Sequence, residues 1–182
     1  MRPAPLLACA FAACGSLAGG IQAAGVPAAV VSGRAPESGA TQVESRVSKL
    51  ASFRKSIRAL YDLKEKAWAA GDAETIVTKF YAPDAVSVGE GESGTLVGRD
   101  QFRAAYRQYV ADVTSVRIES VRTVVNGNAG WDWANFYHTP KADKAKDYPP
   151  SPLRILFLWS KEHGRWVCKG DIFVNGKFDQ PL

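Results

Sequence analysis

Hydrophobic residues recur at helical spacing along the segment that begins near Thr41 and ends at Gly71. The Thr41-x-x-Glu44 pattern is a capping box, which marks a helix start, and glycine is a typical C-terminal stop. Between the two lies one apolar stripe, made by Val43, Val47, Leu50, Ile57, Leu60 or Tyr61, Lys64 and Trp68. The repeat predicts a long helix with a single apolar face.

Shorter elements follow this helix. Asp72 is placed to cap a second helix, and a glycine-rich turn then separates two short strands. Apolar positions on one side of the next segment predict a third helix. The predicted ranges are 72–80 for the second helix, 84–88 and 95–97 for the strands, and 99–110 for the third helix.

The remainder of the chain alternates between apolar and polar residues, which predicts strands. Asn126-Gly127-Asn128 is a strong hairpin turn, and a second hairpin follows a polar loop. The first of the four predicted strands starts near Val116. The other three cover 131–139, 153–160 and 165–174. Helices followed by four long antiparallel strands predict an α+β fold with the helices on one face of the sheet.

The N-terminal 24 residues have the pattern of a secretory signal peptide, with one positive charge at Arg2, an apolar run and an Ala-rich end. The apolar run is shorter than the about 20 residues of a transmembrane helix, so none is expected. Residues 25–40, rich in Pro, Gly, Ala and Ser, predict a flexible linker before a domain over 41–182. We therefore expect an exported protein, either periplasmic or secreted.

Composition narrows the function only a little. The chain has 23 basic and 18 acidic residues, and removing residues 1–24 removes only Arg2, which changes the net charge from +5 to +4. The basic residues are scattered, whereas nucleic-acid sites need clustered basic side chains with aromatic neighbours, so no nucleic-acid partner is expected. Cys168 is the only cysteine after the signal, and a buried bystander is the expected role. Neither histidine has a partner at metal-ligand spacing, so no metal or cofactor is predicted.

Several motifs, taken in order, resemble the nuclear transport factor 2-like superfamily, in particular its SnoaL-like and ketosteroid-isomerase-like branches. They are Ala69-Ala70-Gly71-Asp72, Phe80-Tyr81-Ala82-Pro83-Asp84-Ala85-Val86, Gly98-Arg99-Asp100-Gln101-Phe102, and Gly164-Arg165-Trp166-Val167 followed by Asp171. The resemblance covers about residues 45–176. It implies a cone-shaped, curved antiparallel sheet wrapped on three helices, with a pocket for a small apolar or mixed-polarity molecule.

The isomerases that the chain resembles use a tyrosine on the first helix, a carboxylate base on the first strand and a protonated aspartic acid on the penultimate strand. The resemblance places Lys64, Gly89 and Leu156 at these three positions. Ketosteroid isomerase chemistry is therefore not expected. Fold alone does not assign another activity.

The same resemblance implies which side chains face the pocket. They are Asp132, Phe136 and His138 on one strand, Arg154 and Leu158 on the next, and Lys169, Asp171 and Phe173 on the last.

Asp171 is the candidate general acid or base, with His138 or Tyr61 as its catalytic partner, because a carboxylate in an apolar pocket must be paired or have its pKa raised. The residue types favour a structural pair of Asp171 with Arg154 or Lys169, and a solvent-exposed surface or rim position for His138. A contact of Asp171 with a bound ligand is a further alternative.

Trp131, Trp133 and Tyr137 point outward in this comparison, although theirs is the more aromatic side of the strand. Either the hairpin register differs by one residue and these rings line the pocket, or another subunit covers the outer face of the sheet. Exposed aromatic patches usually mark an interface, and relatives that the chain resembles often dimerise through this face. The sequence therefore slightly favours a homodimer.

Three functions remain open. The favoured one is a small-molecule-binding domain with an apolar pocket and no assigned catalysis. The second is an acid–base isomerase, dehydratase or cyclase, and the third is a dimerisation or association module. The charged loop over 141–150 lies beside the expected pocket mouth and is either solvated surface or a lid.

Export can be tested directly. When the chain is produced in an exporting host, we expect the mature protein to start at Gly25, because the residues before it are the small ones that signal peptidase accepts. N-terminal sequencing and the intact mass check this. Phe11-Ala12-Ala13-Cys14 loosely resembles a lipobox, so a lipidated N-terminal Cys14 is the alternative outcome. An unprocessed chain retained inside the cell would contradict export.

Overall fold

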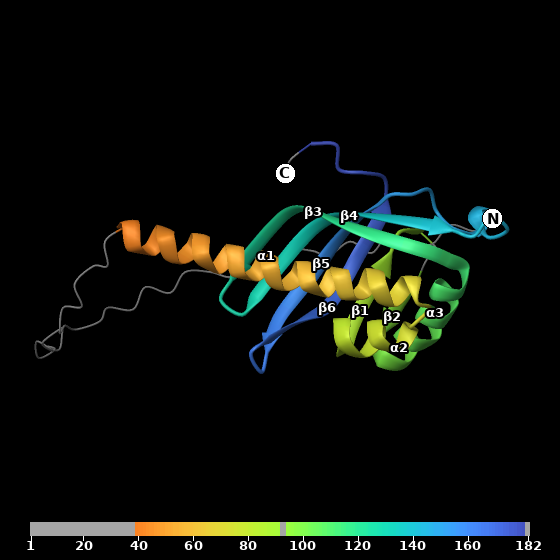
Figure 1. Cartoon of the computed structure of the whole chain (residues 1–182), viewed down its shortest axis with the longest axis horizontal. Helices are drawn as coiled ribbons and strands as arrows, with labels where there is room; N and C mark the ends of the chain where they lie inside the picture. Colours follow the sequence, from red (N-terminus) through yellow and green to blue (C-terminus); the bar gives the residue numbers. More distant parts are fainter. Residues whose placement is uncertain (1–38, 92–93, 181–182) are drawn as a thin grey trace, which may run out of the picture. The chain divides into compact units, whose positions relative to one another are not determined.

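A computed structural model of the protein describes residues 39–91 and 94–180 (Figure 1). Its elements, in chain order, are α1 (Gly39–Ala69), α2 (Ala73–Thr75), the π-helical turn η1 (Ile76–Phe80), β1 (Tyr81–Gly89), β2 (Thr95–Val97), α3 (Gly98–Asp112), β3 (Val113–Asn126), β4 (Ala129–Pro140), the 3-10 turn η3 (Ala145–Asp147), β5 (Leu153–Glu162) and β6 (Arg165–Asn175). The predicted signal peptide (1–24) and most of the predicted linker (25–40) lie outside the described residues.

The six strands form one curved sheet in the order β2-β1-β6-β5-β4-β3 (Figure 1). Neighbouring strands are antiparallel except β1 and β6, which are parallel. The predicted α+β fold, a curved sheet wrapped on three helices, is confirmed. The sheet is mixed rather than wholly antiparallel, because β1 pairs in parallel with β6, the last strand of the chain.

Helix α1 covers the inner face of the sheet with side chains spaced three or four residues apart. Phe53, Ile57, Tyr61, Lys64 and Trp68 are all buried. Residues at this spacing share one side of a helix, which is why the apolar stripe of the sequence becomes the buried face.

The N-terminal part of α1 extends beyond the strands (Figure 1). Val43 and Val47, which belong to the predicted apolar stripe, are exposed there. The helix starts at Gly39, so Thr41 lies within it and the predicted cap at Thr41 is wrong.

A β-bulge in β6 determines which side chains reach the interior. Leu158 pairs with Gly170 and Trp159 with Cys168, so Lys169 is an extra residue without a partner on β5. Because the bulge adds one residue to the alternation, Cys168 and Asp171 both point inward although they are three positions apart. A Cβ atom at Gly170 would overlap the carbonyl of Val86 on β1, so only glycine allows the two strands this approach.

The inner and outer faces of the sheet follow from the strand register. On β5 the buried positions are Leu153, Ile155, Phe157 and Trp159, and they stand opposite the buried residues of β4. Arg154 and Leu158 therefore occupy the outer face, where Arg154 pairs with Asn135 and Leu158 with Trp131. The predicted inward orientation of Arg154 and Leu158 is wrong by one position, since a one-residue shift exchanges the two faces.

The C-terminal segment covers one part of the outer face. The amide of Asn135 accepts a hydrogen bond from the backbone N–H of Phe178 at 2.8 Å and donates to its carbonyl at 3.3 Å. The Phe178 ring packs edge-on against Trp133 at a centroid distance of 5.7 Å. Trp131, Trp133 and Tyr137 do point outward, so the alternative register, which would have placed these rings in the pocket, is wrong.

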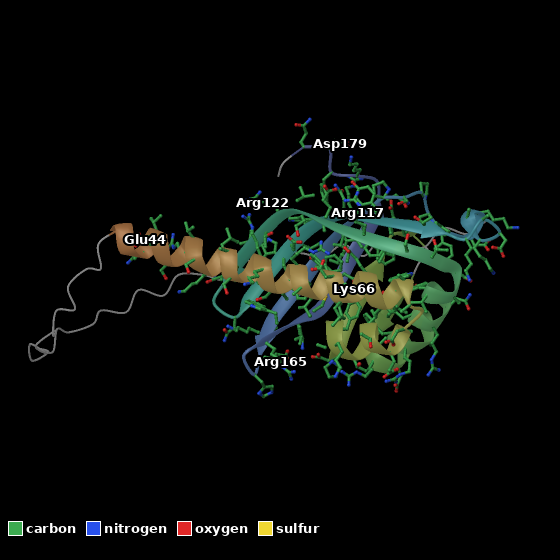
Figure 2. The ribbon with its side chains drawn as sticks, viewed as in Figure 1. Glu44, Lys66, Arg117, Arg122, Arg165 and Asp179 are labelled. Carbon is green, nitrogen blue, oxygen red and sulfur yellow. The ribbon has the colours of Figure 1, made fainter. Side chains whose placement is uncertain are left out.

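Charged side chains lie on several elements of the surface. Figure 2 labels examples on α1, on β3, at the start of β6 and near the C-terminus. Within residues 39–91 and 94–180, none of the helices combines the length and apolarity that a membrane crossing requires.

Candidate functional site

A cavity of about 240 Å³ lies between the inner face of the sheet and helices α1 and α3. Its apolar walls include Trp68, Leu96, Phe136, Leu153, Ile155 and Phe173. Its polar lining includes Lys64, Ser87, Tyr106, His138 and Asp171. An apolar cavity with a few convergent polar groups is the usual form of a small-molecule site, although drug-sized ligands usually occupy about 300–1,000 Å³.

The polar groups at one side of the cavity form a buried network centred on Tyr81. The Nζ atom of Lys64 donates to the Tyr81 hydroxyl at 2.8 Å, and Tyr81 donates to Oδ2 of Asp171 at 2.5 Å. Ser87 donates to the other carboxylate oxygen, Oδ1, at 2.5 Å. Helix α1 and strands β1 and β6 therefore meet through one chain of hydrogen bonds.

The directions of these bonds follow from counting protons. A tyrosine hydroxyl has one proton and two acceptor sites. Because Tyr81 gives its proton to Asp171, the Tyr106 hydroxyl at 2.7 Å must donate to Tyr81 rather than accept from it. Tyr81 thus accepts from Lys64 and Tyr106 and donates to Asp171, so it connects the amine to the carboxylate.

Aromatic rings surround the Lys64 ammonium. Its Nζ lies 4.5 Å from the ring centroid of Phe80 and 4.8 Å from that of Tyr81, and the rings of Tyr106, Phe157 and Phe136 lie within 5.6 Å. Ring faces attract a cation, but they replace water poorly. Burial lowers the pKa of Lys64 from 10.5 to about 8, although the charge of Asp171 opposes the shift.

His138 contributes a second polar group to the cavity. Its Nε2 atom lies 3.0 Å from the carbonyl oxygen of Pro149, and its buried Nδ1 atom has no hydrogen-bond partner among the described residues. Since only a protonated Nε2 can bond to a carbonyl, the neutral ring carries its acceptor lone pair on Nδ1. Burial lowers the pKa of His138, which favours this neutral form. The exposed rim position considered for His138 is wrong, because its side chain is buried.

The loop between β4 and β5 forms part of the cavity wall. Asp147, Tyr148 and Pro149 line the cavity, and the Tyr148 hydroxyl donates to Oδ2 of Asp112 at the end of α3 at 3.1 Å. Lys144 of the same loop lies 3.9 Å from Asp112. The charged loop is therefore more than solvated surface, since three of its residues line the cavity together with His138.

Tyr61 and Asp132 belong to a separate buried cluster. Asp132 accepts hydrogen bonds from the hydroxyls of Tyr61 at 2.8 Å, Ser120 at 2.7 Å and Thr123 at 2.7 Å. Burial raises the pKa of Asp132, and the three hydroxyls act against that shift. Neither Tyr61 nor Asp132 lines the cavity, so the structure does not bring Tyr61 to Asp171.

The remaining predicted residues divide between the cavity and the surface. Asp171, His138, Phe136 and Phe173 line the cavity. Arg154 instead donates to the carbonyl of Asn175, and Lys169 forms ion pairs with Asp84 at 2.5 Å and Glu162 at 3.2 Å. The predicted pocket position of Lys169 and the structural pairing of Asp171 with Arg154 or Lys169 are therefore both wrong.

Sequence reasoning missed four polar members of the site. Lys64 was assigned to the position of a lost catalytic tyrosine, and Tyr81, Ser87 and Tyr106 were given no role. One signal was present, since Lys64 lies on the apolar stripe of α1, and a lysine at a core position is almost always paired. Nothing in the sequence indicates that its partner would be Tyr81 rather than an acid.

The elements and their order define an α+β domain with a curved sheet, and comparisons with known proteins agree with this fold. The SnoaL-like domain family matches residues 57–168, more than half of the chain. Among curated proteins none matches. The chain belongs to the SnoaL-like domain family, within the nuclear transport factor 2-like superfamily.

Solved structures support the same fold. A protein of unknown function from Mycobacterium tuberculosis has 15% identity and a TM-score of 0.60, over 73% of this chain and 77% of that one. A ketosteroid isomerase-like protein from Erwinia carotovora atroseptica has 20% identity and a TM-score of 0.54, over 65% and 92%. An NTF-2 like protein of unknown function from Shewanella oneidensis has 17% identity and a TM-score of 0.56, over 67% and 98%. At these identities the similarity establishes the fold alone.

The lowered pKa of Lys64 predicts a pH-dependent stability difference. Between pH 8 and 10.5 the unfolded chain binds more protons at this lysine than the folded chain, so the lysine's contribution to the free energy of unfolding rises with pH. From pH 8 to 10.5 the free energy of unfolding of wild type should therefore rise by about 3 kcal/mol relative to that of Lys64→Met. Urea unfolding at several pH values measures the difference.

A matched control is Lys161→Met, which replaces an exposed lysine on β5. Its unfolding free energy should stay parallel to that of wild type over the same pH range. If Lys64→Met also stays parallel to wild type, then Lys64 is not buried as an ammonium, and the electrostatic description of the site is wrong.

Proposed function

We propose that the domain binds a small molecule of mixed polarity in the cavity between α1, α3 and the sheet. The observation that carries this proposal is the Nδ1 atom of His138, a buried acceptor in the cavity lining that has no hydrogen-bond partner within residues 39–91 and 94–180. A buried acceptor without a partner costs about 1–3 kcal/mol, and a ligand that donates a hydrogen bond would remove that cost.

The cavity lining suggests the chemistry of the ligand. Apolar side chains form most of the walls, so the ligand body is apolar. Lys64 offers N–H donors to an acceptor such as a carbonyl oxygen, while the adjacent Asp171 disfavours an anionic ligand. A neutral, compact molecule with a carbonyl group at one end and a hydroxyl or amino donor at the other satisfies both sites.

The probe 4-hydroxybenzamide has this arrangement of groups and tests the proposal. We expect it to bind wild type and to bind Leu96→Trp at least about tenfold more weakly, because the larger ring would fill the cavity beside β2. Isothermal titration calorimetry or ligand-observed NMR measures the affinity. Native mass spectrometry of the protein from an exporting host would also show any retained ligand.

The matched control is Leu50→Trp, the same change on a part of α1 that does not line the cavity. It should bind the probe as wild type does. Equal binding to wild type and Leu96→Trp, or no binding of any neutral aromatic carbonyl compound to wild type, would contradict a ligand site in this cavity.

We also propose that the domain dimerises through the outer face of the sheet. Trp131, Leu158, Ile172, Val86 and Val88 are partly exposed on four adjacent strands, and we call this set the outer apolar patch. Trp131 stands opposite Leu158 on β5, and Ile172 opposite Val88 on β1, so the patch is continuous across the strands. A second copy is the occupant that we propose, because a two-fold contact buries the same patch on both subunits.

Replacing two patch residues by arginine tests the dimer. In Leu158→Arg with Ile172→Arg, the like charges would face each other across the contact, so we expect a folded monomer where wild type is a dimer. Sedimentation-equilibrium ultracentrifugation measures the mass. Val47→Arg, an exposed valine on α1, serves as the control and should leave the dimer intact. A monomeric wild type at micromolar concentration would refute this proposal.

A further inference from the structure

We infer that Lys64 is a nucleophile that binds a carbonyl compound covalently, as an imine, inside the cavity. This inference rests on the proposed function and deepens it, because it names the ligand as an aldehyde or ketone with an apolar body. The geometry that carries it is a buried amine in the cavity lining, joined through one hydroxyl to a carboxylate.

The position of Lys64 differs from that of a purely structural lysine. A buried lysine that only balances a charge normally contacts its carboxylate directly. Among the residues that the structure describes, Lys64 has no carboxylate oxygen within salt-bridge distance, and its hydrogen-bond partner is the neutral Tyr81 hydroxyl. The other N–H groups of its ammonium face aromatic rings, which can be exchanged for a ligand.

Tyr81 connects Lys64 to a proton acceptor. The Lys64 ammonium gives a proton to the Tyr81 oxygen at 2.8 Å while Tyr81 passes its own proton to Asp171 at 2.5 Å. The result is a neutral amine and a protonated Asp171, with no net change of charge in the pair. Tyr106 keeps the Tyr81 oxygen hydrogen-bonded throughout, since it donates to the same atom.

The covalent step balances without any other reagent. The nitrogen of the neutral Lys64 amine forms a bond to the carbonyl carbon while the C=O π bond breaks. The carbonyl oxygen takes up one of the two protons of that nitrogen, which gives a neutral carbinolamine. The proton held by Asp171 then returns through Tyr81 to that hydroxyl, which leaves as water while the C=N bond forms. The ammonium and the carbonyl compound have then become a protonated imine and one water molecule.

The surroundings favour the imine over hydrolysis. The cavity is lined by Trp68, Phe136 and Phe173 near the polar network, and these side chains limit the water that would reverse the reaction. The lowered pKa of Lys64, about 8, also raises the fraction of neutral amine near neutral pH above that of an exposed lysine. Once its proton has returned to the leaving hydroxyl, the Asp171 carboxylate is negatively charged again and stabilises the protonated imine.

Trapping of the imine tests the inference. Wild type is incubated with 4-hydroxybenzaldehyde and sodium cyanoborohydride, which reduces an imine to a stable secondary amine, and the modified peptides are mapped by tandem mass spectrometry. We expect Lys64 to be modified at least about tenfold faster than the exposed Lys161. This comparison is made within wild type, so it does not depend on any variant folding.

Two variants test the proton transfer. Tyr81→Phe and Asp171→Asn should slow trapping at Lys64 by about tenfold or more, because general acid–base assistance is lost. Because Tyr81 does not itself line the cavity, the trapping rate in Tyr81→Phe should fall by a larger factor than the affinity for 4-hydroxybenzamide. Equal losses of trapping rate and of amide affinity in Tyr81→Phe would show that Tyr81 acts only through the structure of the site.

The outcomes separate this inference from the proposed function. If 4-hydroxybenzamide binds but the aldehyde modifies Lys64 no faster than Lys161, then the covalent role is wrong while the ligand site stands. If neither compound acts at the cavity, both proposals fail. Rapid, selective modification of Lys64 that 4-hydroxybenzamide slows by competition establishes both.

Discussion

The interior of this domain is arranged around the burial of one charged amine. An isolated ammonium transferred from water into a protein core loses several kcal/mol of solvation, so its surroundings must compensate. Here the compensation comes through the Tyr81 hydroxyl, which accepts from Lys64 and donates to Asp171. Because Lys64 lies on α1, Tyr106 on α3 and Asp171 on β6, this hydroxyl ties both long helices to the sheet. The cavity lies beside this network, since Lys64, Tyr106 and Asp171 are all part of its lining.

The buried carboxylates of Asp132 and Asp171 differ in their hydrogen-bond partners and in their distance from the cavity. Asp132 accepts three hydroxyl hydrogen bonds and lies away from the cavity, which is how a structural polar cluster is normally satisfied. Asp171 has a similar depth, but its network ends at the cavity. The same cavity is lined by His138, whose Nδ1 atom finds no hydrogen-bond partner in the described part of the chain. The fraction of buried polar atoms that have a hydrogen-bond partner, rather than burial itself, distinguishes the part of the core that supports the fold from the part that can bind a ligand.

The order of elements was predictable because the helical repeat before Gly71 and the hairpin turn at Asn126 are strong local signals. The face of the sheet on which each strand side chain lies was harder to predict. Strand β5 has apolar residues on both faces, so alternation could not show that Arg154 and Leu158 point outward. Lys169 was wrongly predicted to face the pocket, because the bulge adds a residue that the alternation of apolar and polar positions does not indicate. The role of Tyr81 depends on a contact ninety positions along the chain, which local patterns do not contain.

Because of the bulge at Lys169, the side chains that reach the cavity depend on the strand register as well as on residue type. If the same residues paired with β5 without a bulge, so that Lys169 stood opposite Leu158, every residue after Lys169 would exchange faces. Asp171 would then meet solvent while a neighbouring apolar side chain entered the core beside Lys64. Relatives of this chain can therefore share an aspartate at the aligned column yet differ in whether it reaches the interior. For this fold, insertions and deletions in the last strand carry as much functional information as substitutions do.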